Sequence, residues 1–330
     1  MKKWKWFFLA FLIVGTVIIL SESKQSKPEY RKAQGLVFGT SYNVTYLYNA
    51  DLKPEIEHTL ALVDSALSMF NPESTISAVN RSESIQVTDT MFLKVFRRAM
   101  EISRMTRGAF DITVAPAVNA WGFGFKHAEN VSQATVDSLR SIIGYTKIHE
   151  QNGLITKDDA RIMLDCSAIA KGFGSDMVAQ MFRSKGINDY MVEIGGEIVL
   201  SGHNPKGKEW NIGINKPIED SLSINNELQT VIPITDIAMA TSGNYRNFYV
   251  KDGRKYAHTI DPHTCMPVSH TLLSATVFAD DCATADAIAT SMMVMGLDSA
   301  RALIGRNPAL RAYFIYSTPD GSIETTAENF

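Results

Sequence analysis

Cysteine is scarce in this chain, and the cysteines that are present lie far apart. The 330 residues contain three of them, Cys166, Cys265 and Cys282, and no C-x-x-C pair. Zinc sites built on thiolates use closely spaced cysteines, and no such pattern occurs here. Because three is an odd number, at least one thiol stays outside any disulfide. We expect all three to be small buried residues.

Signatures of the common nucleotide-binding folds and of nucleic-acid binding are also missing. No G-x-G-x-x-G follows a strand and no G-x-x-x-x-G-K-[ST] occurs, so any nucleotide site must be of another kind than the Rossmann unit or the P-loop. Residues 31–330 hold 27 basic and 33 acidic side chains, a balance of about −6. A nucleic-acid partner needs a basic face, and this balance argues against one.

The first thirty residues differ in composition from the rest of the chain. Three lysines precede an apolar run over residues 6–20, and a polar stretch follows. This layout is typical of a secretory signal, and the run is short for a membrane span. No clear small-x-small cleavage site and no lipid-carrying cysteine follow it, so an uncleaved anchor stays open. We expect residues 1–30 to be a signal peptide or membrane anchor, residues 31–330 to form the folded domain, and the protein to be exported to the periplasm, at the inner membrane.

Helical and extended patterns mix along residues 31–330 without strict alternation, which predicts an α+β fold with mixed sheets and packed helices. The spacing of apolar residues predicts helices over 54–69, 88–105, 131–143, 169–185, 283–295 and 298–305. Strands are predicted over 36–48, 110–114, 190–200, 210–214, 229–234, 272–279 and 311–316, with hairpins at 151–153 and 252–253. Residues 116–125 are expected to form an ordered loop, and Gly195-Gly196 to mark a bulge or a close backbone approach within a strand.

One segment combines several features of a binding site: Asp165-Cys166-Ser167-Ala168-Ile169-Ala170-Lys171-Gly172 lies where an extended run meets a helix-like segment. A helix entrance offers unpaired N–H groups and a positive dipole end. With Lys171 and two nearby glycines, it suits a phosphate group. The carboxylate of Asp165 suits a divalent metal or a hydroxyl. An ordinary helix start, with Ser167 as cap and glycines for packing, remains the alternative at this point.

Further short motifs follow the same order as in one known family. They are Gly39-Thr40-Ser41-Tyr42, Met69-Phe70-Asn71-Pro72-Glu73-Ser74, Gly108-Ala109-Phe110-Asp111-Ile112-Thr113-Val114, Trp121-Gly122-Phe123-Gly124, Glu193-Ile194-Gly195-Gly196-Glu197, Thr241-Ser242-Gly243-Asn244-Tyr245-Arg246, His258-Thr259-Ile260-Asp261-Pro262 and Ala285-Asp286-Ala287-Ile288-Ala289-Thr290. Together with the segment above, they resemble the ApbE family, the FAD:protein FMN transferases, from about Gly35 to the C-terminal region. The resemblance implies a T-fold-like α+β architecture over residues 31–330, which would form the catalytic domain.

A pair of oxygen ligands is predicted on the last strong helix. Asp286 and Thr290 are four residues apart and share one face, and a carboxylate with a hydroxyl suits magnesium. The alternative is an exposed Asp and a Thr that bonds to its own helix. The helix is otherwise apolar and small, so Asp286 is not expected on an open face. The resemblance implies that both residues bind Mg²⁺ and adds the backbone carbonyl of Ala168 as a ligand.

His258 is the candidate catalytic residue. Alternation places it at the end of a strand, and the nearby carboxylate of Asp261 could tune it. A lone histidine is more often structural than catalytic. The resemblance implies a position near the reacting phosphate, and we assign His258 the role of general base toward an attacking hydroxyl.

Flavin nucleotide contacts follow from the resemblance. Phe70 occupies the position where the family usually has a flavin-contacting Tyr, and in some relatives a small polar residue there accompanies FAD hydrolysis. Phe keeps the ring and lacks the hydroxyl, which favours transfer and leaves the ratio of transfer to hydrolysis open. The expected cofactor-binding residues are Phe38, Phe70, Ala109, Phe110, Asp111, Asp165, Lys171 and Ile260, with the Trp121 motif and Thr241-Ser242-Gly243 as further candidates.

These residues predict a magnesium-dependent enzyme that transfers FMN from FAD to a Thr or Ser hydroxyl of a partner protein and releases AMP. The resemblance implies acceptor subunits of membrane or exported redox complexes of the NADH:quinone or ferredoxin oxidoreductase type. Two alternatives stay open. One is an FAD pyrophosphatase that yields FMN and AMP, and the other is a non-catalytic exported FAD-binding protein, which would need neither a metal nor a base.

Overall fold

An eight-stranded antiparallel sheet organises the molecule, with strand order β1-β2-β6-β7-β10-β15-β16-β17. The computed structural model describes residues 27–124, 131–217, 227–244, 248–251 and 254–330, with a few positions before residue 12. The predicted signal or anchor over residues 1–30 therefore lies almost entirely outside the described residues. Among the residues described, no helix has the length and apolar character to cross a membrane.

The elements of the central sheet come from the whole length of the chain. Its strands are β1 (Glu29–Val37), β2 (Thr40–Tyr48), β6 (Tyr190–Ile194), β7 (Glu197–Ser201), β10 (Ile237–Gly243), β15 (Leu272–Ala279), β16 (Arg311–Ser317) and β17 (Ile323–Glu328). Smaller sheets are formed by β3 (Ser84–Gln86), β4 (Ile148–Gln151) and β5 (Leu154–Lys157), by β8 (Trp210–Asn215) and β9 (Leu228–Ile234), by β11 (Phe248–Lys251) and β12 (Arg254–Ala257), and by β13 (Ile260–Asp261) and β14 (Met266–Pro267). The helices are α2 (Lys53–Leu67), α3 (Thr75–Arg81), α4 (Thr90–Met105), α5 (Ala115–Ala120), α6 (Gln133–Ile142), α7 (Ala170–Ser184), α8 (Cys282–Met295) and α9 (Leu297–Gly305), with a 3-10 turn at Tyr145–Lys147.

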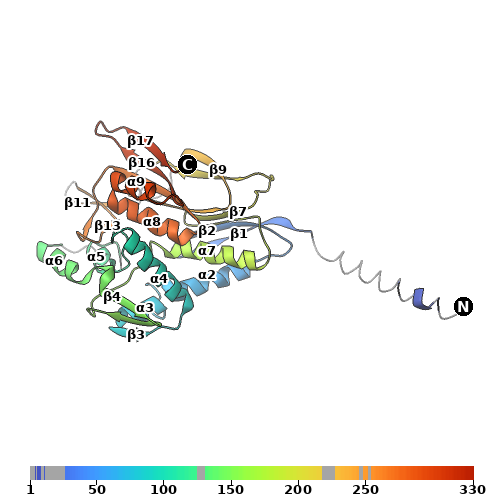
Figure 1. Ribbon diagram of the computed structural model, residues 1–330, viewed down its shortest axis with the longest axis horizontal. Coiled ribbons are helices and arrows are strands. Elements are labelled where there is room, and N and C mark those ends of the chain that lie inside the picture. The colour runs from blue at the N-terminus through green and yellow to red at the C-terminus, as the bar shows by residue number, and fades with distance from the viewer. Residues whose placement is uncertain are drawn as a thin grey trace.

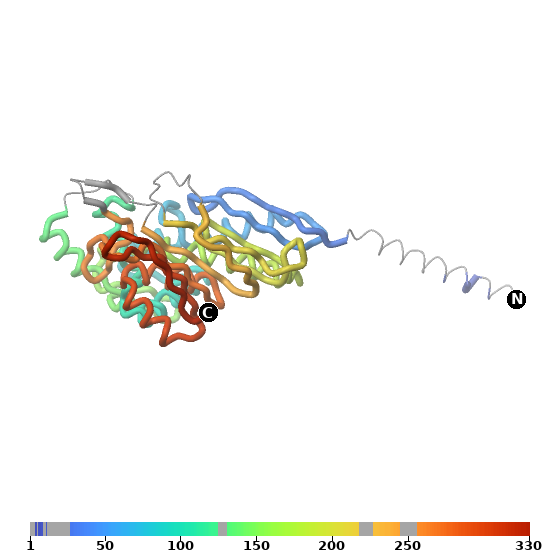
Figure 2. The backbone as a smooth tube through the Cα atoms, turned by 90° about the horizontal axis from the view of Figure 1, so that it is seen from above, coloured from blue at the N-terminus to red at the C-terminus, as the bar shows by residue number. Residues whose placement is uncertain are grey.

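Helices α2, α7, α8 and α9 lie as a row along the sheet, and α4 packs against α2 and α8 (Figure 1). Seen from above, the β1–β2 hairpin and strands β16–β17 lie at opposite ends of the sheet, as the strand order requires (Figure 2). The β8–β9 ribbon covers the other face. Along β7, Val199 belongs to the core on the helix side, while Ile198 and Leu200 pack with Trp210 of β8, since alternate strand residues face opposite sides.

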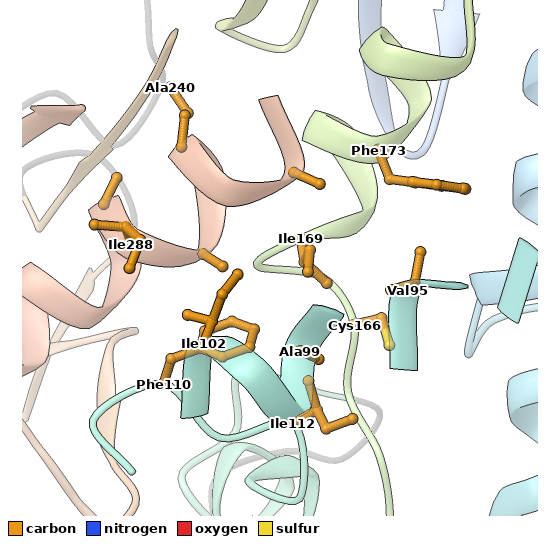
Figure 3. Close-up of a cluster of buried hydrophobic side chains, with 14 of the residues drawn as sticks. Val95, Ala99, Ile102, Phe110, Ile112, Cys166, Ile169, Phe173, Ala240 and Ile288 are labelled. Atoms are coloured by element: carbon orange, nitrogen blue, oxygen red, sulfur yellow. The ribbon is translucent and has the colours of Figure 1, made fainter. Parts of the chain in front are cut away.

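The largest hydrophobic core joins α4, the start of α7 and α8 (Figure 3). Ile102 of α4, Ile169 before α7 and Ile288 of α8 are fully buried in it. Helix α8 is buried on nearly all sides, because it packs against β10, β15, α4, α7 and α9. Its apolar composition follows from this position. The start of α7 and the middle of α8 are therefore held on one rigid packed core.

The α+β fold is confirmed, and the helices predicted from apolar spacing are present within a few residues of their expected ends. The predicted strand over 36–48 is instead a hairpin of β1 and β2, with Phe38 and Gly39 at positive φ in its turn. The predicted strand over 190–200 is also a hairpin. Gly195 and Gly196 form its two-residue turn, both with positive φ, as a type I′ turn requires.

Two other local predictions were wrong. Residues 110–114 form turns with one isolated bridge from Val114 to Met163, and part of the expected loop over 116–125 is helix α5. Several elements had not been predicted, among them α3, β3, β14, β10 and β17. The last two lie in the sheet among residues of low or mixed apolar alternation, so their partners rather than their own pattern define them.

Candidate functional site

The start of α7 lies directly against the side of α8. The backbone N–H of Gly172 donates to Oδ2 of Asp286 at 3.1 Å. A side chain at position 172 would collide with the carbonyl of Cys282, and one at position 174 would meet the ring of Phe38. Both glycines therefore permit close packing within the protein, which corrects the expectation that they give room to a phosphate. The two segments predicted to share a metal are in direct contact.

The N-terminal backbone donors of α7 are largely used inside the protein. The residue before the helix is Ile169, which cannot cap it, so the alternative of Ser167 as cap is wrong. The N–H groups of Ile169 and Ala170 donate to the carbonyl of Cys166, and the N–H of Ser167 donates to Oδ1 of Asp165 at 2.7 Å. The Lys171 side chain, rather than these donors, is the positive group that faces open space here.

Lys171 lies between two buried carboxylates. Its Nζ is 3.3 Å from Oε1 of Glu197 and 4.0 Å from Oδ1 of Asp286. Burial raises the pKa of both Glu197 and Asp286, although Lys171 opposes this. Burial alone would lower the pKa of Lys171, but the charges of Asp286 and Glu197 outweigh it and raise that pKa. One cation thus faces two carboxylates, and a further positive charge would stabilise both as anions.

These groups line a cavity of about 330 Å³, called here the polar cavity. It also contains Ala168, His258, Ile260 and Thr290, together with Thr241 and Ser242 of β10. The Thr290 hydroxyl lies 3.0 Å from the Ser242 hydroxyl. The His258 ring packs edge-on against Phe123, with ring centroids 6.4 Å apart. The polar cavity therefore brings together the predicted metal ligands Ala168, Asp286 and Thr290, the predicted base His258, and Lys171.

A second cavity of about 630 Å³, called the aromatic cavity, adjoins the first, since Ser167 and Lys171 line both. It is lined by Phe38, Met69, Phe70, Leu67 and Asp165, among others. Phe70 is 74% exposed at its wall, so it is no core residue. Burial raises the pKa of Asp165. The volume of the aromatic cavity lies in the range of small-molecule pockets.

Three predicted cofactor-binding residues, Ala109, Phe110 and Asp111, lie outside the described linings of both cavities. Phe110 is in the core between α4 and α8 (Figure 3). The Asp111 carboxylate accepts from the N–H and hydroxyl of Thr113 and from the N–H of Tyr145 at 2.6 Å, and burial raises its pKa. Asp111 therefore ties two loops together here, and a flavin contact stays a prediction for this group.

Asp261 and Trp121 make contacts in the structure that the sequence did not predict. The Asp261 carboxylate, expected to tune His258, accepts from the backbone N–H of His263 and lies 3.2 Å from its Nδ1. Trp121 donates its indole N–H to the carbonyl of Cys265 at 2.8 Å and is buried. All three cysteines are free and buried, as expected.

Glu197 is a site residue to which sequence reasoning assigned no role. Glu197 belongs to the Glu193–Glu197 motif, directly after the glycine turn, and it starts a strand whose next three residues are apolar. A charged residue at the first position of a buried strand was the available signal. Its carboxylate was not connected with Lys171 because the two are brought together only by the packing of α7 on β7.

The oxygen donors of the polar cavity fit a magnesium ion. In the part of the chain that the structure describes, no group of three or more His, Cys, Asp or Glu side chains could hold a metal. Magnesium does not require one, because it keeps several waters and takes one or two carboxylates with substrate phosphates. Asp286, Thr290 and Ala168 all line this cavity. A zinc-type set of thiolates and imidazoles is not found there.

Known proteins resemble this chain over most of its length. The family model described as the ApbE family matches residues 38–314. The FAD:protein FMN transferase of Vibrio cholerae is 36% identical over 330 residues, covering 97% of each chain, and that of Escherichia coli K12 is 33% identical over 82% of this chain and 78% of its own. The solved flavin transferase ApbE from Vibrio cholerae superposes with a TM-score of 0.82 at 37% identity, covering 91% of this chain and 97% of that one. The apo flavinyl transferase ApbE of Pseudomonas stutzeri gives 0.81 at 28% identity, covering 92% and 95%. The chain therefore belongs to the ApbE family.

Proposed function

We propose that this protein transfers FMN from FAD to a Thr or Ser hydroxyl of an acceptor protein, with Mg²⁺ bound, and releases AMP. One observation carries the proposal: the polar cavity joins the start of α7, the middle of α8, strand β10 and the segment at His258, four regions far apart in the sequence. Relatives that match nearly the whole chain are named FAD:protein FMN transferases.

Mg²⁺ would be held by Asp286, the Thr290 hydroxyl and the Ala168 carbonyl, and when bound it would neutralise charge on the diphosphate and the leaving group. The structure supports this assignment through the two carboxylates that share the single ammonium of Lys171. Binding alone would need neither this charge arrangement nor a base beside it. The family's named activity and the cavity together favour an enzyme over a storage protein.

Lys171 lies on the wall shared by the two cavities, so its ammonium can contact a phosphate that spans them. The acceptor oxygen attacks the FMN phosphorus, and a new P–O bond forms as the bond to the AMP oxygen breaks. His258 takes the hydroxyl proton as the attack proceeds. The products are the phosphoester-linked FMN and AMP. The positive charge of Lys171 stabilises the phosphoryl oxygens during the displacement.

The aromatic cavity is the proposed seat of a flat ring of FAD, with Phe38 and Phe70 on its walls. Aromatic rings stack on flat conjugated systems. Because Phe70 offers a ring without a hydroxyl, hydrolysis of FAD by water at the same phosphorus is the competing outcome. The predicted contacts from Ala109, Phe110 and Asp111 would require those residues to reach the dinucleotide from outside both described cavities.

The test combines the full-length protein, FAD, Mg²⁺ and a candidate acceptor subunit, followed by mass measurement of the acceptor. Addition of one FMN mass with stoichiometric AMP supports transfer. Free FMN and AMP formed without acceptor as fast as with it would support the pyrophosphatase hypothesis. Tight FAD retention with no AMP, with or without Mg²⁺, would support a binding protein.

We further propose that the protein acts outside the cytoplasm, held at the inner membrane by its lysine-flanked apolar segment over residues 6–20. The acceptors would be membrane or exported subunits of redox complexes of the NADH:quinone or ferredoxin oxidoreductase type. Fractionation of cells that produce the full chain, with protease accessibility of the folded domain, tests the location.

A further inference from the structure

One carboxylate oxygen in the polar cavity lacks a partner. Glu197 is 3% exposed, and its Oε2 is buried without a hydrogen bond among the residues that the structure describes. A buried unpaired oxygen is destabilising, so a carboxylate kept in this position has a role besides packing. Its other oxygen, Oε1, contacts Lys171.

The position of Glu197 is set by the backbone. The residue follows the tight Gly195-Gly196 turn and pairs with Ile194 across the β6–β7 hairpin. Its carbonyl accepts a hydrogen bond from the Ser175 hydroxyl of α7 at 3.1 Å. The Glu197 backbone is thereby fixed to the same helix that carries Lys171, which keeps its carboxylate within reach of the ammonium.

The ammonium of Lys171 is drawn to one of its two carboxylates. It is 3.3 Å from Glu197 and 4.0 Å from Asp286. Asp286 has its Oδ2 engaged by the N–H of Gly172, so Oδ1 is the oxygen that a cation would share with Lys171. A small movement of the ammonium toward Asp286 would close an ion pair on that oxygen.

We propose that Glu197 is a positioning residue, which holds the Lys171 ammonium away from Asp286 and so keeps Oδ1 of Asp286 open to a divalent cation. The inference rests on the proposed function, because it takes Asp286 as a metal ligand. Without the charge of Glu197, Lys171 pairs with Asp286 and competes with the metal. The role of Glu197 is thus exerted through Lys171 and not through direct contact with the metal.

A double-mutant cycle tests this with Mg²⁺ alone as the probe, without FAD or acceptor. Mg²⁺ affinity is measured by calorimetry for wild type, Glu197→Gln, Lys171→Met and the double variant. We expect Glu197→Gln to weaken Mg²⁺ binding by about tenfold or more in the wild-type background and by less than about threefold in the Lys171→Met background. Circular dichroism and thermal unfolding establish that each variant is folded.

An equal loss in both backgrounds would mean that Glu197 acts only through its general field, and the inference would be overturned. Should Glu197→Gln fail to fold, Glu197→Asp serves, because it keeps the charge but withdraws it from Lys171. A weakened Mg²⁺ affinity in that variant supports the positioning role, and an unchanged affinity contradicts it. If wild type binds no Mg²⁺ in the absence of FAD, this inference is overturned, while the metal of the proposed function is tested separately by the Mg²⁺ dependence of AMP release from FAD. Normal wild-type binding with equal losses in both backgrounds removes the inference alone.

Discussion

Two groups of charged side chains from different elements meet along helix α8, about one turn apart, and their hydrogen bonds differ. At its start, Asp281 caps the helix through the N–H of Thr284, and Arg98 donates to Asp281, Glu101 and Thr284. Asp176 accepts from two backbone N–H groups there, at 2.8 and 2.9 Å. One turn later, Asp286 accepts from one backbone N–H and shares Lys171 with Glu197, whose Oε2 has no hydrogen-bond partner among the described residues.

Both groups border cavities, so a cavity alone does not distinguish them. The cavity at the start of α8 has a volume of about 560 Å³ and is lined by Arg98, Asp176 and Asp281, among others. The difference lies in hydrogen bonding. Asp176 and Asp281 each accept at least two hydrogen bonds, one or more on each carboxylate oxygen, whereas among the described residues Asp286 accepts one on Oδ2 and Oε2 of Glu197 accepts none. We infer that the first group stabilises the helix and that the second serves chemistry.

The sharpest test replaces one carboxylate of each group by alanine, in separate variants. Asp286→Ala should reduce Mg²⁺-dependent transfer by about a thousandfold, because it removes a charge aimed at the reacting centre, while some FAD binding remains. Asp281→Ala is the matched control, and it should lower the free energy of unfolding by about 1 kcal/mol through loss of the cap with activity of the folded protein retained. Initial rates and thermal unfolding measure both. Equal effects of the two substitutions on activity would remove the distinction.

His258 tests whether the cavity beside the second group performs acid–base chemistry. His258→Ala should lower the transfer rate by about 10²–10⁴-fold and leave FAD affinity near that of wild type, since the residue is assigned to the proton and not to binding. Single-turnover AMP release and FAD titration separate the two quantities. A wild-type rate would withdraw the role of base from this residue.

Asp176, in the group at the start of α8, should make the free energy of unfolding depend on pH. Burial, above all, raises the pKa of Asp176 to about 7. An acid with a raised folded pKa contributes stability that is full below its unfolded pKa, near 4, and is lost as pH rises through 7. Asp176→Asn does not titrate, so its stability relative to wild type should improve between pH 4 and pH 8 by roughly 1–4 kcal/mol. Urea unfolding at several pH values measures this, and a constant difference would contradict it.

The smallest effect is expected at the wall of the aromatic cavity. Phe70 is 74% exposed, so Phe70→Ser should leave stability within about 0.5 kcal/mol. Loss of the ring should weaken FAD binding several-fold and raise the share of free FMN over acceptor-bound FMN. Phe70→Tyr is the matched variant and should keep the wild-type ratio. An unchanged product ratio in Phe70→Ser would show that the ring does not exclude water.

Local sequence determined those parts of the protein that depend on near neighbours. The apolar spacing of α2, α4, α6, α7 and α8 predicted these helices because each buries one stripe or, for α8, almost its whole surface. The motifs around Lys171, His258 and Asp286 predicted one site, and the structure brings these three residues to one cavity. That step depended on the resemblance of these motifs to the family, because each residue alone also fits a structural role.

Only the tertiary structure decided which groups touch. The sequence predicted that Gly172 and Gly174 leave space for a ligand. In the structure they leave space for Cys282 and Phe38, each more than a hundred residues away along the chain. Asp111, predicted as a cofactor contact, also accepts a hydrogen bond that ties two loops together. Glu197 lies beside Lys171 because α7 packs on β7. Side-chain hydrogen bonds and charge pairs join distant segments, and their partners have no periodic signal in the sequence. Packing of the sheet and helices therefore set the electrostatics of the site, while the sequence by itself determined its chemical components.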